Sequence, residues 1–154
     1  KSFTASKDFA FAVSFVHAKT IDKKGIVFGI KLAMNRCLKK ISKNPKETKV
    51  LLDGSLKAPE KFRNQRTIIK GDEKEPVISL ASIVAKVSRD RYMCKIAKEY
   101  PKYNFEKHKG YGTKAHVEVI KEFGRSEQHR FTFKLKALGE ESIKTPKKVQ
   151  KSLF

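Results

Sequence analysis

KVLLDG at residues 49–54 and TIIKGD at residues 67–72 are two short apolar runs, and each ends at an aspartate that has a glycine beside it. Runs rich in Val, Ile and Leu that close on turn residues are typical of buried strands. These two predict strands over 49–52 and 67–70. Asp53 and Asp72 therefore follow closely after the ends of two predicted strands.

The residues before and after these two segments have the periodicity of helices. Residues 25–41 (GIVFGIKLAMNRCLKKI) have apolar side chains at three- and four-residue steps, which predicts an amphipathic helix. Pro76 suits a first helical turn and precedes a long predicted helix over 77–100. A third helix is predicted over 114–123, between a threonine and a glycine that suit its two caps. Because strands and helices alternate along the chain, we expect an α/β domain.

The two ends of the chain give weaker signals. FAFAVSFVH at 9–17 is typical of a largely buried strand, and 21–24 is expected to be a turn or the approach to a helix. Residues 131–133 (FTF) are expected to be extended. The basic stretch 138–154 is expected to be a short helix or a disordered tail.

The composition points to a polyanion-binding protein. The chain has 154 residues, with 36 Lys and Arg against 16 Asp and Glu, which gives a formal charge of +20. This length favours one domain, and no apolar run approaches the ~20 residues of a membrane helix. The charge predicts salt-sensitive binding to nucleic acid, although a lysine-rich solvated surface has the same composition. Cys37 and Cys94 form neither a disulfide framework nor a metal cluster with other ligands, so we expect a cytoplasmic protein.

Asp53 and Asp72 are the candidate catalytic residues. In an open α/β sheet ligands bind beyond the strand ends, so neighbouring strands would bring both carboxylates to one edge. Carboxylates that lie close together repel each other unless a cation joins them, and oxygen ligands suit Mg²⁺ or Mn²⁺. Such ions activate water and stabilise the leaving oxygen in phosphodiester hydrolysis. The alternative is that both aspartates are ordinary turn residues.

A basic loop provides the candidate nucleic-acid contacts. Tyr111 lies between two glycines in KHKGYGT (107–113), where an aromatic ring can stack on a sugar or a base. The alternative is a tyrosine packed on the domain surface. His108 and Lys109 are candidate contacts to nucleic acid. Both His108 and His129 are expected to be phosphate contacts or hydrogen-bond anchors rather than catalytic bases.

Other acidic residues have ordinary explanations. Asp90 lies between two arginines in the long predicted helix, so we expect it to make an ion pair or to cap a neighbouring segment. Glu73 and Glu75 lie near a helix start, where acidic side chains suit the helix dipole. They are also candidates for outer metal ligands.

Five segments follow one another along the chain: KVLLDG (49–54), IIKGD (68–72), LASIVAKVSRDR (80–91), YPKYNFEKHKGYGTKAH (100–116) and HRFTF (129–133). In this order they resemble type 2 ribonuclease H, the ribonuclease HII family. KLAMNRCL (31–38) also resembles the helix that precedes the third active-site strand of that family. The resemblance covers roughly residues 1–137, which we expect to form the catalytic domain, whereas 138–154 match no motif. It implies an RNase H-like α/β fold with a mixed central sheet flanked by helices.

The resemblance also implies an activity. The family consists of metal-dependent endonucleases that hydrolyse the phosphodiester 5′ to a ribonucleotide, in RNA–DNA hybrids or in duplex DNA with embedded ribonucleotides. The products are a 3′-hydroxyl and a 5′-phosphate. Of the four acidic ligands of the family, the last two correspond to Asp53 and Asp72, with Mg²⁺ or Mn²⁺ as the expected cofactor. The sugar-stacking tyrosine of the family, which helps to sense an RNA-to-DNA junction, corresponds to Tyr111.

One family motif has no counterpart in the sequence. The first strand of the family bears Asp-Glu-x-Gly-Arg-Gly, and these 154 residues contain no such segment. Half of the metal site and the first strands of the sheet are therefore expected to be missing, which would leave apolar surface exposed. The chain is then a fragment of a longer protein, or a second chain supplies the strands, or it is a non-catalytic basic nucleic-acid-binding module derived from the same fold. We favour the fragment, because Asp53, Asp72 and Tyr111 are all present.

Overall fold

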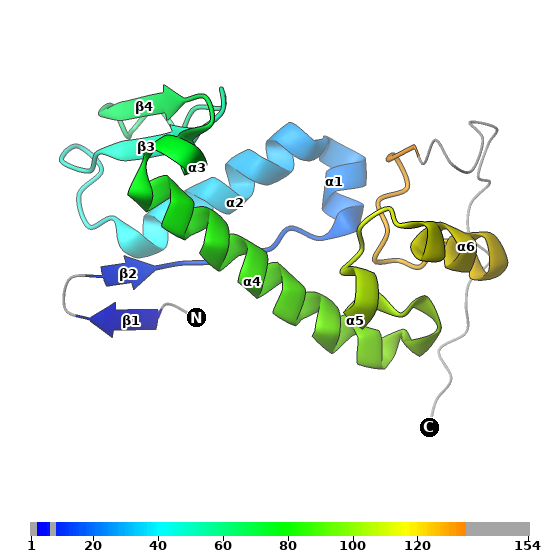
Figure 1. Cartoon of the computed structure of the whole chain (residues 1–154). Coiled ribbons are helices and arrows are strands. Elements are labelled where there is room, and N and C mark those ends of the chain that lie inside the picture. Colours follow the sequence, from blue (N-terminus) through cyan, green and yellow to red (C-terminus); the bar gives the residue numbers. More distant parts are fainter. Residues whose placement is uncertain (1–2, 7–8, 135–154) are drawn as a thin grey trace. The chain divides into compact units, whose positions relative to one another are not determined.

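The computed structural model describes residues 3–6 and 9–134 of the chain, which form a mixed α/β fold as predicted (Figure 1). The described residues group into two compact units, the first formed by residues 3–6, 9–16 and 24–88 and the second by residues 17–23 and 89–134. In chain order the elements are β1 (Phe3–Ser6), β2 (Phe9–Phe11), α1 (Ala18–Lys24), α2 (Ile26–Ile41), β3 (Val50–Asp53), β4 (Gln65–Ile68), α3 (Gly71–Lys74), α4 (Pro76–Glu99), the 3-10 helix η1 (Pro101–Tyr103), α5 (Phe105–His108) and α6 (Lys114–Phe123).

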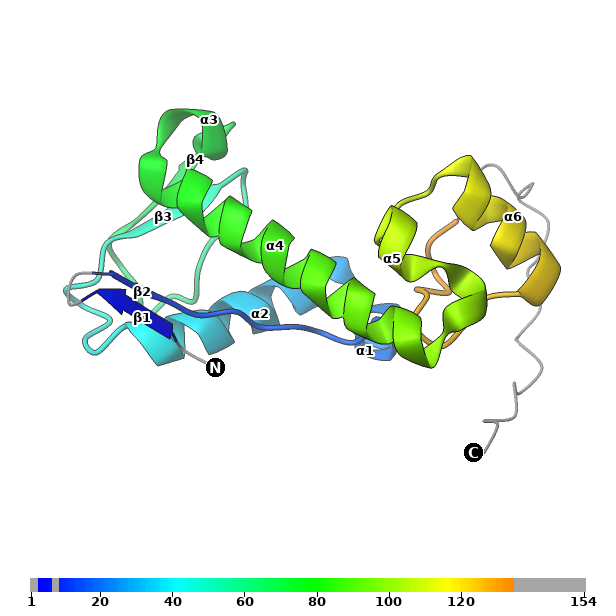
Figure 2. The same cartoon turned by 60° about the horizontal axis from the view of Figure 1, so that its bottom comes forward.

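The first unit is built around the parallel pair of strands β3 and β4, with α3 beside the end of β3 (Figure 2). Among the described residues each of these strands has one hydrogen-bonded neighbour, so each has an unpaired outer edge there. The register pairs are Val50–Gln65, Leu51–Arg66, Leu52–Thr67 and Asp53–Ile68. The core of this unit consists of Val50, Leu52, Ala58 and Phe62, with Met34 and Leu38 of α2 packed against it.

The positions of these strands were predicted with unequal accuracy. The strand expected over 49–52 is confirmed as Val50–Asp53, whereas the one expected over 67–70 is observed earlier, at Gln65–Ile68. Lys70 has a left-handed backbone (φ 55°) and Gly71 starts α3, so the chain leaves the extended conformation immediately after the strand.

The strand predicted near the N-terminus is shorter than expected. The strand expected over 9–17 ends at Phe11, and residues 12–17 have no regular secondary structure. β2 pairs antiparallel with β1 in a hairpin that the sequence reading missed. Residues 21–24 are helical, as part of α1, rather than a turn.

Helix α4 contributes residues to both units and leaves apolar side chains exposed in the first. Val77 is 59% exposed and Ile83 is 54% exposed, and Ile69, just after β4, is 74% exposed. Side chains of this kind normally lie in a core. The expected exposure of apolar surface is therefore observed.

The second unit packs around aromatic residues. Thr113 caps α6 by accepting a hydrogen bond from the backbone N–H of His116 (3.3 Å), and Gly124 follows its last turn, so that helix is confirmed at both ends. The buried cluster consists of Ile96, Ala97, Tyr103 and Phe105, with Tyr92, Met93, Tyr100 and Val119 packed against it.

Residues 131–133, expected to be extended, form a turn instead. The buried guanidinium of Arg125 donates hydrogen bonds to the carbonyls of Phe131 (2.8 Å) and Phe133 (2.8 Å), and so curls this segment around itself. The Asp22 carboxylate of α1 accepts hydrogen bonds from the backbone N–H of Thr132 (3.0 Å) and from its hydroxyl (2.7 Å). Polar anchors, not a sheet partner, thus determine its conformation.

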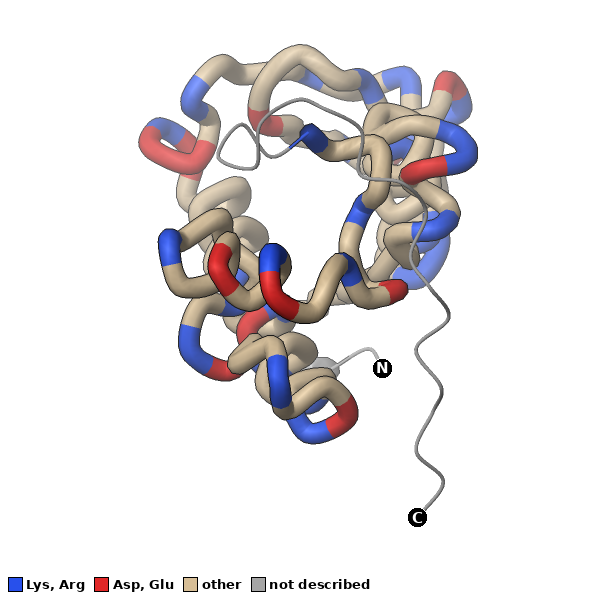
Figure 3. Tube along the Cα trace, turned by 90° about the vertical axis from the view of Figure 1, so that its right-hand side faces the viewer, with Lys and Arg blue, Asp and Glu red and all other residues tan. Residues whose placement is uncertain are grey.

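Basic side chains occur on elements of both units rather than in one segment (Figure 3). None of the helices in the described part of the chain combines enough length and hydropathy to span a membrane.

Candidate active site

Asp53 occupies the last position of β3, and its side chain reaches toward the start of α3. Its Oδ1 atom accepts a hydrogen bond from the backbone N–H of Gly71 at 2.9 Å. This contact joins two residues that are 18 positions apart, and it follows from the parallel pairing of β3 with β4.

Asp72 follows Gly71 directly and lies in the first turn of α3. Gly71 is buried, and a Cβ atom built on it would lie 2.7 Å from Ile78 Cδ1 and 3.5 Å from Asp53 Oδ1. The absence of a side chain at position 71 therefore permits the close approach of the two segments. The structure thus brings the segments of Asp53 and Asp72 together at one edge of the pair of strands, and both residues are exposed.

The donor set at this edge fits a magnesium ion that also binds substrate. Mg²⁺ in phosphate-processing sites is often bound by one or two carboxylates, with water and phosphate oxygens completing the octahedron. Among the described residues no group of three or more His, Cys, Asp or Glu side chains could hold a metal ion, so Asp53 and Asp72 alone would be only part of a ligand set. Glu73, a candidate outer ligand, lies 3.5 Å from the ammonium of Lys70 as an exposed ion pair.

An apolar cavity of about 280 Å³ lies beside Asp53. Its composition does not suit a metal or a phosphate, and it adjoins the exposed apolar side chains of α4. Its lining residues are Met34, Leu51, Leu52, Asp53, Val77, Ile78, Ala81 and Ser82.

Asp90 does not make the ion pair that the sequence suggested. Its Oδ1 atom is buried and has no hydrogen-bond partner among the described residues, and no ion pair to it is found there. A buried carboxylate oxygen without a partner is unusual, because its desolvation is not offset.

The loop that contains Tyr111 lies in the second unit. Tyr111 is 50% exposed, and the Arg89 guanidinium lies 4.5 Å from the centre of its ring. Gly110 has a positive φ of 75°, and a Cβ atom there would lie 3.3 Å from Met93 Cε. The glycine before Tyr111 is therefore required both by its backbone conformation and by the close packing on α4.

The two predicted neighbours of Tyr111 are placed differently. The Lys109 ammonium donates hydrogen bonds to Cys94 Sγ (3.0 Å) and to the carbonyl of Glu106. His108 is buried, its Nε2 lies 2.8 Å from the Tyr103 carbonyl, and its Nδ1 accepts from the Gly110 N–H at 3.2 Å. Both ring nitrogens of His108 are thus engaged by the backbone of its own unit.

His116 is a residue that the sequence reading missed. It is buried, stacks on His108 with ring centres 4.0 Å apart, and its Nδ1 lies 2.8 Å from the Tyr111 carbonyl. Its Nε2 lies 3.0 Å from Nε2 of His129. A lone histidine within an amphipathic helix carries no periodic signal, so only the tertiary structure shows that it supports the loop.

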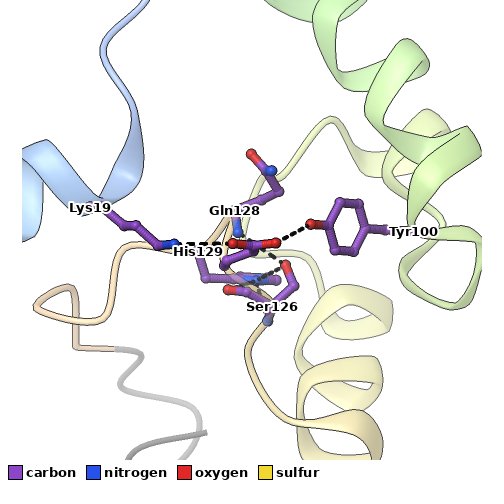
Figure 4. A network of polar contacts seen from close by, with 6 residues as sticks. Lys19, Tyr100, Ser126, Gln128 and His129 are labelled. Carbon is purple, nitrogen blue, oxygen red and sulfur yellow. Dashed lines mark hydrogen bonds and ion pairs between the residues drawn. The ribbon is translucent and has the colours of Figure 1, made fainter. Parts of the chain in front are cut away.

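His129 is a hydrogen-bond anchor, one of the two roles considered for it. Its Nδ1 lies 2.8 Å from the Ser126 hydroxyl, in a network where Glu127 also bonds Lys19 (3.1 Å) and Tyr100 (3.0 Å) (Figure 4). Burial, reinforced by the nearby His116, lowers the pKa of His129 to about 4. Burial also lowers the pKa of His116, so both rings are neutral at pH 7.

Comparison of the sequence with known proteins identifies the family to which the chain is similar. A sequence model of the family described as Ribonuclease HII matches residues 1–136. A protein named Ribonuclease HII from Aliarcobacter butzleri is 51% identical over 146 residues, which cover 94% of this chain and 71% of that protein. The protein of the same name from Fusobacterium nucleatum is 49% identical over 142 residues (90% and 66%). The one from Caldicellulosiruptor bescii is 46% identical over 127 residues (82% and 60%). The chain thus spans 60 to 71% of the length of these three relatives.

Proposed function

Because the chain belongs to the ribonuclease HII family, we propose that it forms the greater part of a type 2 ribonuclease H. The proposed reaction is metal-dependent hydrolysis of the phosphodiester 5′ to a ribonucleotide, with a 3′-hydroxyl and a 5′-phosphate as products. The substrates are RNA–DNA hybrids or duplex DNA with embedded ribonucleotides. Residues 1–137 are proposed as the catalytic domain, in a cytoplasmic protein.

The observation that supports this proposal most is the hydrogen bond from the Gly71 N–H to Asp53 Oδ1 at 2.9 Å. It fixes one oxygen of Asp53 and holds the backbone beside Asp72, so that both carboxylates can face one Mg²⁺ or Mn²⁺ ion. When bound, the metal would activate a water molecule and stabilise the leaving oxygen. Asp53 and Asp72 would hold the metal ion in place, and the Gly71 N–H would keep the Asp53 carboxylate oriented.

The second unit would supply contacts to the substrate. Tyr111 presents a half-exposed ring that can stack on the sugar of a ribonucleotide, and the Lys109 ammonium can contact a phosphate. His108, whose ring nitrogens bond the backbone of its own unit, would contribute by shaping the loop rather than by touching the nucleic acid. The formal charge of +20 supports attraction to the duplex as a whole.

A further strand is proposed to cover the exposed apolar surface of the first unit. β3 and β4 have unpaired outer edges among the described residues, and Val77 and Ile83 are exposed near the cavity beside Asp53. Either an N-terminal segment of a longer chain or a second chain would complete the sheet and add the remaining acidic ligands. Burial of two such side chains contributes about 3 kcal/mol or more to that association.

The alternative is a non-catalytic basic nucleic-acid-binding module. It is supported by the presence of only a partial ligand set in the described residues. A nicking assay separates the two proposals: a DNA duplex with one embedded ribonucleotide is incubated with Mg²⁺ or Mn²⁺ and the chain alone, or the chain extended by the N-terminal segment of the Aliarcobacter butzleri relative. A cut 5′ to the ribonucleotide in either form supports the enzyme. Metal-independent binding without a cut in both forms supports the binding module.

A further inference from the structure

We propose that His116 and His129 are positioning residues for Tyr111, and that they hold its main-chain carbonyl through one fixed arrangement of ring protons. The inference deepens the proposed function and rests on the role proposed there for Tyr111. It concerns His116, which is buried, and His129, which is partly buried and contacts His116.

The proton positions follow from partners that can only donate or only accept. The Tyr111 carbonyl can only accept, so His116 must have its proton on Nδ1 to bond it at 2.8 Å. In the neutral ring, Nε2 of His116 is then bare, and the proton between it and Nε2 of His129 (3.0 Å) must belong to His129. Nδ1 of His129 is therefore also bare.

The next partner of His129 is Ser126, whose backbone N–H can only donate and therefore agrees with a bare Nδ1. A bare Nδ1 on His129 accepts from the Ser126 N–H (3.0 Å) and from the Ser126 hydroxyl (2.8 Å). At the other end, His108 accepts on Nδ1 from the Gly110 N–H and so donates from Nε2 to the Tyr103 carbonyl. These proton positions satisfy the donor-only and acceptor-only partners named above, and no donor faces another donor. The 3.3 Å contact between Nδ1 of His129 and the Ser126 carbonyl joins two acceptors, so it is not a hydrogen bond in this arrangement.

The backbone of Tyr111 is held on both sides by this set of rings. Its N–H donates to the carbonyl of His108 at 2.8 Å, and its carbonyl accepts from Thr113 N–H (2.8 Å) as well as from His116. The stack of His108 on His116 ties these contacts together. Because both peptide groups of Tyr111 are fixed, the direction of its side chain is restricted before any nucleic acid binds.

The surroundings keep an additional proton away from the rings. The groups that act on His129 electrostatically are His116 on α6, His108 on α5 and the cationic Arg125, and the titratable ring of Tyr103 on η1 lies 5.4 Å away. No carboxylate is among the groups that shift the pKa of either histidine. A proton on His116 Nε2 would face the N–H of His129, so protonation would disrupt the support of the loop.

The ring protons can be observed directly by long-range ¹H–¹⁵N correlation spectra of the full chain at pH 7. The expected result is His116 protonated on Nδ1, and His108 and His129 protonated on Nε2. His17, the remaining histidine, serves as the exposed internal reference. An Nε2-protonated His116, or rapid exchange between both forms, would overturn the inference whatever the enzyme does.

The functional arm compares two replacements of His116. His116→Asn retains an N–H near the position of Nδ1, whereas His116→Leu removes it, and His17→Asn is the control. We measure the ratio of affinities for a ribonucleotide-containing duplex and the all-DNA duplex, without divalent metal. The loss of one hydrogen bond predicts a roughly fivefold smaller ratio for the Leu variant and partial retention for the Asn variant.

The outcomes distinguish the positioning role of His116 from the role proposed for Tyr111. Equal ratios in the wild type and both His116 variants would overturn the positioning role. A wild-type chain with no preference would instead overturn the role proposed for Tyr111, and the spectra would then decide the proton arrangement alone. If the Leu variant does not fold, the comparison of His116→Asn with the wild type, read together with the spectra, decides the question.

Discussion

The Arg89 guanidinium lies 4.5 Å from the centre of the Tyr111 ring. Arg89 is on α4, and Tyr111 is on the loop that packs on this helix through Gly110. The cation therefore holds the ring from the helix side, while half of the side-chain surface remains accessible. The loop is thus fixed through the ring by Arg89 and through the backbone by His116.

Replacement of Arg89 should reduce the preference for ribonucleotide-containing duplexes that Tyr111 confers. A cation–π contact at an exposed site is worth about 0.5–1 kcal/mol. Arg89→Ala should therefore lower the ratio of affinities for the ribonucleotide-containing and the all-DNA duplex about two- to fivefold, and Arg89→Lys should lower this ratio less. Arg91→Ala removes the same charge from an exposed position on the same helix and is the matched control. If Arg89→Ala and Tyr111→Ala reduce the ratio additively in the double variant, the two residues do not act as a pair.

Gly71→Ala should destabilise the edge where the two aspartates meet. The new methyl group would lie 2.7 Å from Ile78 Cδ1, and overpacking of this kind costs roughly 1–3 kcal/mol. Ile78→Val removes that same Cδ1 atom, so the double variant should lose less stability than the sum of the two single variants. Urea denaturation of the wild type, the two single variants and the double variant measures this coupling. Strict additivity would show that the contact with Ile78 Cδ1 does not cause the destabilisation.

Acid should destabilise the second unit between about pH 6.5 and pH 4. The pKa of His129 is lowered to about 4 in the folded protein, so the unfolded chain binds the proton more readily in that range. The contribution of His129 to the free energy of unfolding is complete above its pKa in the unfolded chain. It is lost progressively as the pH falls toward the pKa of His129 in the folded protein. At pH 5 the loss should be about 2 kcal/mol relative to pH 7.

Asp22 does not account for a loss in this range. Burial alone raises the pKa of Asp22, but hydrogen bonds from Thr132 and Phe131 outweigh it and leave the pKa lowered. Asp22 therefore loses its contribution below the usual range of an aspartate. The pH dependence of the urea midpoint in wild type and His129→Gln tests the assignment, because the variant should respond less between pH 7 and pH 5. An equal response would assign the loss to other groups.

Metal binding can be tested without cleavage. Mn²⁺ added to the ¹⁵N-labelled chain should broaden the amide signals of residues next to Asp53 and Asp72 first, since a paramagnetic ion acts on nearby nuclei. Asp53→Asn should weaken this effect more than tenfold in metal concentration, because an amide is a poorer ligand than a carboxylate. Glu60→Gln makes the same charge change at an exposed position and is the control. Broadening that is uniform over the chain, or unchanged in Asp53→Asn, would contradict a site at this edge.

The sequence predicted those elements whose own residues determine them. Helix α6 is flanked by Thr113 and Gly124, and these local signals placed its ends correctly. α2 likewise has a clear apolar stripe. The approach of the Asp53 and Asp72 segments at one sheet edge was also inferred from two strand-and-turn patterns, and the structure shows a contact between these segments through Gly71.

Features that depend on distant contacts were missed or misplaced. Residues 131–133 look extended but are curled by Arg125 and Asp22, which no local pattern reveals. His116 and His129 support the Tyr111 loop only because α6 and the following segment bring them together. The roles of Asp53, Asp72, Lys109 and Tyr111 in binding metal or nucleic acid stay predictions.

The most direct test of the account is the rate and position of cleavage by the chain extended with the N-terminal segment of its relative. The substrate is a DNA duplex with one embedded ribonucleotide in Mg²⁺, and the product ends are mapped. The account predicts a cut 5′ to the ribonucleotide that Asp53→Asn and Asp72→Asn each slow by more than about 100-fold, with duplex binding retained and Glu60→Gln unchanged. Cleavage at the wild-type rate in either aspartate variant would contradict it.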